Sequence, residues 1–152
     1  MPAEPDALEA ALAALQRKER TAHELALLLK RRGFRLEEID EALNRLLQAG
    51  AVDDERFARR YAEDKRELAG WGAERIREAL LERGVPGAVV EAVLSSDSYS
   101  DQLERAREIL IRRGRTLTRN PDRRRALEYL IRRGYDYEIA YEAVRRAEPR
   151  AA

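Results

Sequence analysis

The sequence contains no cysteine, which excludes disulfide bonds, thiolate metal sites and a cysteine nucleophile. Its single histidine, His23, has no second histidine or cysteine with which to form a metal site, so we interpret it as an ordinary surface residue. Aromatic residues make up only 6% of the 152 residues, and no apolar run approaches the length of a membrane span. The short, acidic start of the chain differs from a secretory signal. We therefore expect a cytoplasmic protein with no membrane contact.

The motifs of common enzymes are also missing from the sequence. There is no glycine-rich phosphate loop, no serine-centred elbow and no H-E-x-x-H motif. The adjacent carboxylates of Asp53 and Asp54 could serve acid–base chemistry, but their place at the start of a helical pattern favours helix capping. We therefore predict a protein that is not an enzyme, with no catalytic, cofactor-binding or metal-binding residues.

What the sequence does contain is a repeat. Three helical patterns end in basic or acidic residues followed by a glycine and an apolar residue, at residues 30–34, 82–85 and 132–135. The glycines of these stretches are 51 and 50 residues apart: Gly33, Gly84 and Gly134. A constant period of this length predicts stacked units of one supersecondary design. Such units form a long, shallow surface rather than a deep catalytic pocket.

The spacing of apolar residues predicts nine helices in three groups of three, without sustained strand alternation. We place three-helix repeats at residues 6–50, 51–98 and 99–148. The predicted fold class is therefore all-α, with three tandem helix-turn-helix-like repeats. Thr21 and Glu24 have the spacing of a capping box, and Asp6 and Asp53 are placed to cap helices. The helix after Asp53 carries Phe57 on its inner face. Asn120 and Pro121 predict an N-cap followed by proline at the first helical position.

Charge is distributed unevenly along the chain. Residues 1–100 carry 16 Lys or Arg and 20 Asp or Glu, whereas residues 101–152 carry 14 Arg and 9 Asp or Glu. This asymmetry favours a polarised surface, with a polyanion as a binding partner near the C-terminal repeat. The alternative is a set of helical surfaces covered by ordinary ion pairs, and the sequence leaves both interpretations open.

Most of the C-terminal positive charge lies around one loop and the helix that follows it. The arginines concerned are Arg112, Arg113, Arg115, Arg119, Arg123, Arg124, Arg125, Arg132 and Arg133. Phosphate binding needs many such donors on one face, because affinity comes from counterion release. Guanidinium groups also bind the carboxylates of protein partners in a bidentate manner. We favour a nucleic-acid or acidic-partner contact for the loop cluster, whereas Arg132 and Arg133 also suit the negative end of a helix.

Two aromatic features are open to more than one interpretation. Trp71 lies between two glycines, where we favour a ring that fills a gap between helices over an exposed anchor. Tyr137 and Tyr141 lie four residues apart on one helical face. They form either a stacking or interface patch or the amphipathic closure of the last helix.

Four motifs, in this order, resemble those of the RecX family of regulatory proteins. They are Arg20 to Leu25 with Leu29 and Arg32-Gly33-Phe34; Val52-Asp53-Asp54-Glu55-Arg56-Phe57-Ala58; Gly72, Ile76, Leu80, Gly84 and Val85; and Leu130-Ile131-Arg132-Arg133-Gly134-Tyr135. The resemblance covers roughly residues 10–147 and departs from the pattern at Val52, which replaces leucine, and in an arginine-rich stretch at 119–125. The motif residues that we interpret as structural are Thr21, Glu24, Gly33, Asp53, Asp54, Phe57, Gly72, Gly84 and Gly134.

The resemblance implies a regulator without a cofactor. RecX-like proteins are expected to have tandem three-helix repeats in an elongated, curved arrangement. They are expected to bind RecA, to lodge in the groove of the RecA–single-stranded DNA filament and to inhibit its recombinase, ATPase and coprotease activities in DNA repair, recombination and the SOS response. A monomer with weak direct DNA contact is expected. The alternatives are a helix-turn-helix transcriptional regulator, which commonly dimerises, and a purely structural helical adaptor.

Overall fold

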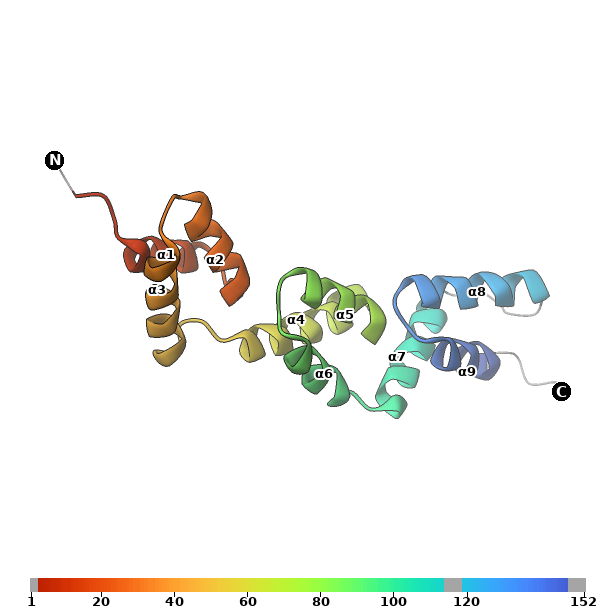
Figure 1. Ribbon diagram of the computed structural model, residues 1–152. Coiled ribbons are helices and arrows are strands. Elements are labelled where there is room, and N and C mark those ends of the chain that lie inside the picture. Colours follow the sequence, from red (N-terminus) through yellow and green to blue (C-terminus); the bar gives the residue numbers. More distant parts are fainter. Residues whose placement is uncertain (1–2, 114–118, 148–152) are drawn as a thin grey trace. The chain divides into compact units, whose positions relative to one another are not determined.

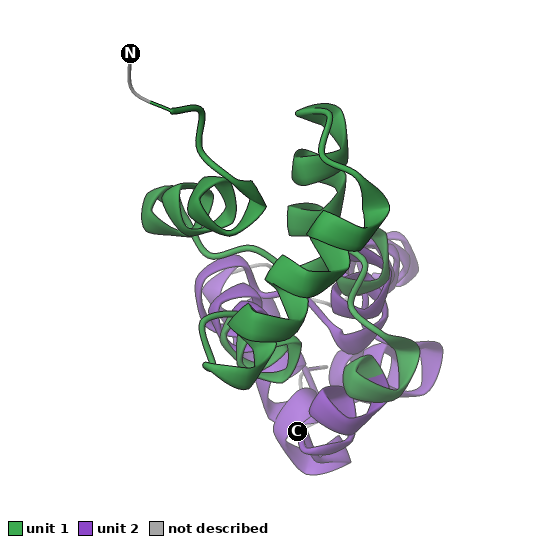
Figure 2. Cartoon of the chain, turned by 60° about the vertical axis from the view of Figure 1, so that its left-hand side comes forward, with its two compact units in different colours: residues 1–60, 80–90 green, residues 61–79, 91–152 purple. Residues whose placement is uncertain are grey.

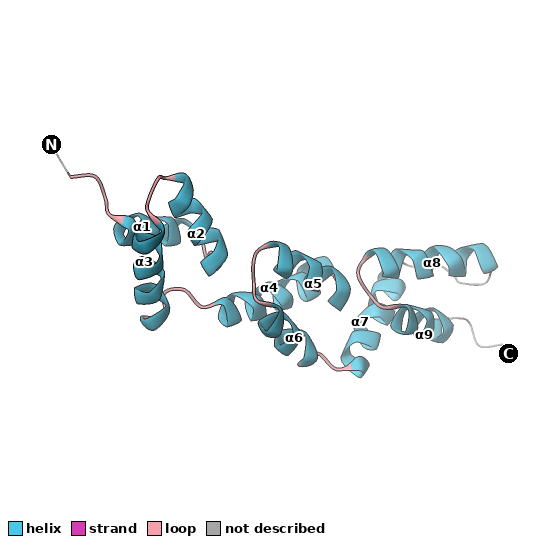
Figure 3. Ribbon diagram, in the orientation of Figure 1, coloured by secondary structure: helices cyan, strands magenta, loops and turns pink. Residues whose placement is uncertain are grey.

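The computed structural model describes residues 3–113 and 119–147, which form nine helices and no strand (Figures 1 and 3). The helices are α1 (Ala7–Arg17), α2 (Ala22–Arg31), α3 (Leu36–Gln48), α4 (Asp54–Ala69), α5 (Ala73–Glu82), α6 (Gly87–Ser95), α7 (Tyr99–Arg112), α8 (Asn120–Arg132) and α9 (Tyr137–Ala147). The predicted all-α class is confirmed for this part of the chain. None of the helices within it is both long enough and apolar enough to span a membrane.

Several helices begin where the sequence predicted. The Asp6 carboxylate accepts a hydrogen bond from the Glu9 N–H at 2.8 Å and caps α1. Thr21 and Glu24 form the predicted capping box, in which each side chain accepts from the other residue's backbone N–H at 3.1 Å. Asp53 Oδ1 accepts from the Arg56 N–H at 3.0 Å and caps α4. These starts depend on contacts three residues apart, which a sequence motif encodes.

The start of α8 differs from the prediction. Asn120 was expected to be the N-cap, but Arg119 occupies the cap position and makes no side-chain cap hydrogen bond. The Asn120 side chain instead accepts from Arg123 Nη1 at 3.2 Å. Pro121 has a fixed φ that suits the first turn of a helix and no N–H that needs an acceptor there. The helix can therefore begin one residue earlier without a side-chain cap.

The three predicted glycine turns have one backbone geometry. Gly33, Gly84 and Gly134 have φ values of 90°, 81° and 101°. In each turn the residue after the glycine donates its N–H to a carbonyl in the preceding helix: Phe34 to Leu29 at 3.2 Å, Val85 to Leu80 at 3.1 Å and Tyr135 to Leu130 at 3.1 Å. This geometry ends α2, α5 and α8 with a left-handed glycine, as expected for a helix C-terminus.

The chain divides into two units, which Figure 2 shows in different colours. The first unit comprises residues 1–60 and 80–90, and the second comprises residues 61–79 and 91–152. In the first unit α1, α2 and α3 pack against one another around Leu25, Leu29 and Ile39. In the second unit α7 and α8 both pack against α9 around Leu130 and Ile139.

Candidate functional site

A joint in the first unit connects the start of α2 to the end of α5. Thr21 is fully buried, and its Oγ1 donates a hydrogen bond of 2.7 Å to the backbone carbonyl of Arg83. The Arg83 guanidinium in turn donates to the two carboxylate oxygens of Glu24 at 2.9 and 3.1 Å, and lies 4.5 Å from the centre of the Phe57 ring. We call this arrangement the first joint. Thr21, Glu24 and Phe57 therefore hold helices together in the structure.

The Asp53–Asp54 pair provides two helix caps. Asp53 caps its own helix, whereas Asp54 Oδ1 accepts a hydrogen bond of 2.9 Å from the backbone N–H of Ala22. Asp54 therefore satisfies a free N–H in the first turn of α2, which lies 32 residues earlier in the chain. Both carboxylates are engaged with backbone N–H groups, which agrees with the capping interpretation of this pair.

Glu24 is the charged group of the first joint. Burial alone would raise the pKa of its carboxyl group, but hydrogen bonds from the Thr21 backbone and from the Arg83 side chain outweigh this effect and lower the pKa. The side chains of Glu24 and Arg83 are 24% and 29% exposed, so the ion pair is partly shielded from solvent. Glu24 therefore stabilises the joint in its ionised form.

A second joint lies in the second unit, between the start of α5 and the end of α8. The Gly72 N–H donates to the Arg133 carbonyl at 2.7 Å, and the Glu74 N–H donates to the Gly134 carbonyl at 2.9 Å. A Cβ atom at Gly72 would lie 2.4 Å from the carbonyl carbon of Gly134. Glycine is therefore required at position 72 by the close approach of the two backbones.

An arginine-lined groove of about 580 Å³ lies in the second unit. We name it the arginine groove; its walls come from the end of α4, from α7 and from α8. The residues that line it are Arg66, Glu67, Leu68, Ala69, Gly70, Arg105, Glu108, Ile109, Arg112, Arg113, Tyr129 and Arg133. The groove thus holds five guanidinium groups against two carboxylates, and its lining is positively charged at neutral pH.

Tyr129 organises one wall of the arginine groove. The Arg113 guanidinium carbon lies 3.7 Å from the centre of the Tyr129 ring, and Arg133 Nη2 donates to the Tyr129 hydroxyl at 2.6 Å. Arg133 also donates to the backbone carbonyl of Ala69. Burial would raise the pKa of Tyr129, but hydrogen bonds from Arg113 and Arg133 outweigh it and lower that pKa. These contacts hold both arginines in place.

Asp97, which does not itself line the groove, binds two of the arginines that do. Its carboxylate, 5% exposed, lies 3.4 Å from Arg66 Nε and accepts a hydrogen bond from Arg105. Burial lowers the pKa of Arg66; burial acts in the same direction on Arg105, but the contacts with Asp97 outweigh it and raise that pKa. Within the described part of the chain, the buried Nη2 of Arg66 has no hydrogen-bond partner. One carboxylate therefore compensates only part of the charge of two arginines.

The groove gathers part of the predicted arginine cluster. Arg112, Arg113 and Arg133 line it, whereas Arg115 lies outside the described residues. The remaining arginines lie elsewhere on α8 or at its start: Arg119, Arg123, Arg124, Arg125 and Arg132. Arg119 pairs with Asp122 at 3.3 Å, and Arg124 and Arg125 are exposed. Sequence reasoning missed Arg66 and Arg105, because nothing local to α4 or α7 indicates that Asp97 brings them together.

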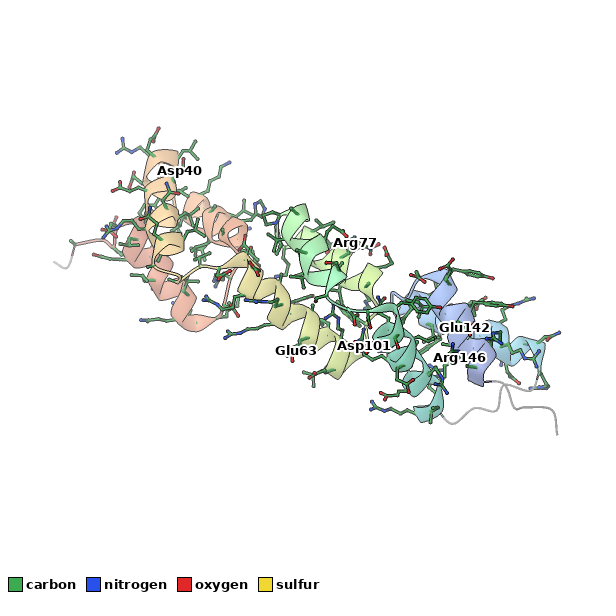
Figure 4. The ribbon with its side chains drawn as sticks, turned by 90° about the horizontal axis from the view of Figure 1, so that it is seen from below. Asp40, Glu63, Arg77, Asp101, Glu142 and Arg146 are labelled. Carbon is green, nitrogen blue, oxygen red and sulfur yellow. The ribbon has the colours of Figure 1, made fainter. Side chains whose placement is uncertain are left out.

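The tyrosines of α9 form an exposed patch. Tyr137 and Tyr141 are 61% and 53% exposed, and their rings stack with centroids 6.0 Å apart at an interplanar angle of 22°. The interpretation of these residues as the amphipathic closure of the last helix is therefore wrong. On the same helix, Arg146 donates to Glu142 at 2.8 Å; both side chains are labelled in Figure 4. Hydrogen bonds from Arg145 and Arg146 lower the pKa of Glu142 to about 2.

Trp71 is half-buried between cationic side chains. Lys65 Nζ lies 4.7 Å from the centre of its ring and the Arg75 guanidinium carbon lies 4.2 Å from it, while Tyr61 packs edge-on at 6.4 Å. The ring therefore packs between side chains of α4 and α5, in agreement with the favoured interpretation. Residues 3–113 and 119–147 contain no group of three or more histidines, aspartates or glutamates placed to hold a metal ion.

Comparisons with known proteins identify the family. Residues 7–46 match the family model of the first three-helix domain of RecX, and residues 53–94 match that of its second three-helix domain. The regulatory protein RecX of Trichlorobacter lovleyi is 34% identical over 139 residues, which cover 88% of this chain and 90% of the relative. The regulatory protein RecX of Halorhodospira halophila is 38% identical over 131 residues, which cover 84% of this chain and 79% of the relative. The crystal structure of RecX from Lactobacillus salivarius shares the fold, with a TM-score of 0.84 at 19% identity over 93% and 94% of the two chains. The resemblance seen in the sequence is confirmed: this chain belongs to the RecX family of regulatory proteins.

Proposed function

We propose that this chain is a non-enzymatic regulator that binds RecA and the RecA–single-stranded DNA filament and inhibits recombinase, ATPase and coprotease activities in DNA repair. Its membership of a family whose proteins are named regulatory supports the regulatory part of this proposal. The arginine groove supports the binding part, because it presents guanidinium groups that are held in place by Asp97 and Tyr129. The proposed site of action is the cytoplasm, and the proposed state is a monomer.

The lining of the groove favours an acidic protein surface over a DNA backbone. Leu68, which is 84% exposed, and Ile109 lie among the arginines. An apolar side chain makes no favourable contact with a phosphate group, whereas arginine mixed with apolar residues is typical of protein interfaces. Planar guanidinium groups also bind carboxylates through two parallel hydrogen bonds. We therefore assign the groove to acidic residues of RecA and leave a weaker DNA contact to the arginines of α8.

The repeats would allow one chain to contact more than one RecA protomer. We propose three-helix repeats at residues 6–50, 51–98 and 99–148 as the contacting units. Several weak contacts on one filament act together, because each bound repeat raises the effective concentration of the next. The exposed Tyr137–Tyr141 pair is proposed as an additional contact, since stacked aromatic residues are common at binding surfaces.

Cosedimentation with preformed RecA–single-stranded DNA filaments tests the proposal. We expect the chain to pellet with filaments and to remain in solution with single-stranded DNA alone at the same salt concentration. Footprinting on duplex DNA without RecA provides the contrasting measurement. Sequence-specific protection there, without filament binding, would favour a helix-turn-helix regulator, and binding to neither would favour a helical adaptor.

A further inference from the structure

One arginine–glycine turn occurs three times in the described part of the chain. An arginine and a left-handed glycine end α2, α5 and α8, at Arg32-Gly33, Arg83-Gly84 and Arg133-Gly134. The three turns share the backbone hydrogen bond that follows the glycine. Because backbone geometry and residue types agree, the three turns present the same groups: the last carbonyls of a helix and a guanidinium.

Two of these turns dock onto the start of another helix. At the first joint, the Arg83 carbonyl accepts from Thr21 Oγ1, and the Arg83 guanidinium binds Glu24. At the second joint, the carbonyls of Arg133 and Gly134 accept from two N–H groups at the start of α5. In both cases the negative end of one helix meets the positive end of another, and groups that lack a partner within their own helices are satisfied.

Glycine is required for this docking. A Cβ atom at Gly84 would lie 2.3 Å from the Cβ of His23, and one at Gly134 would lie 2.5 Å from the Cβ of Arg75. Side chains at either position would therefore separate the turn from the helix start. The docked turns are closely fitted contacts between helix ends.

The third turn is not docked. A Cβ atom at Gly33 would have nothing within 4 Å, although Gly33 keeps the φ of 90° seen in the docked copies. Arg32 and its neighbours Lys30 and Arg31 are exposed. Among the described residues, nothing forms a hydrogen bond or ion pair with the Arg32 guanidinium. Among the described residues, this turn is thus one exposed copy of an element that occurs twice in docked form.

The equivalent helix start of a second copy suits the exposed turn poorly. That start is the start of α8, where Pro121 has no N–H to donate. The carboxylate of its first turn, Asp122, is already paired with Arg119 at 3.3 Å. A helix start on a different protein, with unsatisfied N–H groups and an available carboxylate, suits the turn better.

We propose that the Arg32–Gly33 turn docks onto a helix N-terminus of the RecA protomer whose first turn carries a carboxylate. The N–H groups of that helix donate to the carbonyls of Arg32 and Gly33, and its carboxylate binds the Arg32 guanidinium, as Glu24 binds Arg83 in the first joint. This inference rests on the proposed function and adds to it a second contact on the first unit, separate from the arginine groove.

The test is the affinity of the fluorescently labelled full chain for preformed RecA–single-stranded DNA filaments, measured by anisotropy. Arg32→Glu should weaken binding about tenfold, because a charge-assisted hydrogen bond becomes a repulsion. Arg17→Glu is the matched control: Arg17 is also an exposed arginine in the last turn of a helix of the first unit, but it lies outside a glycine turn of this kind. Arg17→Glu should leave affinity nearly unchanged, and both variants should melt at the same temperature.

Each other outcome overturns the inference in a recognisable way. If wild type binds filaments and Arg32→Glu binds equally well, the docking inference fails and the proposed function stands. If Arg17→Glu weakens binding as much as Arg32→Glu, overall charge explains the effect and the specific docking is wrong. If wild type fails to bind filaments at all, the proposed function and this inference fail together.

Discussion

The hydroxyl of Thr21 donates a 2.7 Å hydrogen bond to the backbone carbonyl of Arg83, 62 residues later in the chain. The same oxygen accepts from the Glu24 N–H and caps α2. One fully buried side chain therefore serves both a helix start and the first joint.

Replacing Thr21 by valine should destabilise the protein. The substitution keeps the shape of the side chain but removes the cap and leaves the partly buried Arg83 carbonyl without its partner, at a cost of about 2 kcal/mol. Urea unfolding followed by circular dichroism measures this cost. Thr21→Ser retains the hydroxyl group and should lose much less; equal losses for the two variants would show that the hydrogen bonds contribute little.

Replacing Gly72 by alanine should weaken the second joint. The new Cβ atom would lie 2.4 Å from the Gly134 backbone, and overpacking of this kind costs about 1–3 kcal/mol. The melting temperature provides the measurement. Gly87→Ala is the control, because a Cβ atom there meets nothing within 4 Å, so it should be neutral or stabilising. A Gly72→Ala variant as stable as Gly87→Ala would contradict the close approach of the two backbones.

Stability should depend on the ionisation of Glu24. Its pKa is lowered in the folded protein, so its contribution is fully present above the unfolded value of 4.5 and is lost as the pH falls through the lower folded value. Glu24→Gln should therefore cost about 1 kcal/mol at neutral pH, allowing for the partial exposure of the pair. The difference from wild type should shrink in acid. Unfolding curves at neutral and acidic pH test this, and a difference that does not change with pH would rule out the ion pair as its source.

The arginine groove should contribute more to filament binding than the arginines of α8. The double substitution Arg112→Glu with Arg113→Glu should weaken binding at least about tenfold and change its salt dependence, because both residues line the groove. The triple substitution of Arg123, Arg124 and Arg125 to alanine should weaken binding less and lower its salt sensitivity, since these residues lie outside the groove. Anisotropy across a salt titration compares the two sets. The reverse order of effects would move the main contact to α8.

The features that the sequence predicted depend on neighbouring residues. The caps at Asp6, Thr21 and Asp53 involve hydrogen bonds between residues three apart, so a motif is enough to find them. The glycine turn at Gly33 is similarly local, because a left-handed glycine can end a helix without any contact with distant residues.

The features that were missed depend on distant residues. Asp97 brings Arg66 and Arg105 together from two helices, and no spacing along either helix indicates this. Gly72 was recognised as a motif residue, but the reason for it is the backbone of Gly134. The exposure of Tyr141 could not be predicted either, because a helical pattern does not show whether another element covers that face of the helix.

Regulation of RecA is tested most directly by the rate of ATP hydrolysis by RecA on single-stranded DNA as this protein is titrated in. We expect the rate to fall at substoichiometric amounts of the wild-type chain, and far more of the Arg112→Glu, Arg113→Glu variant to be needed for the same loss. An unchanged rate at all concentrations, together with no cosedimentation on filaments, would contradict the proposal that this RecX family member regulates RecA by binding its filament.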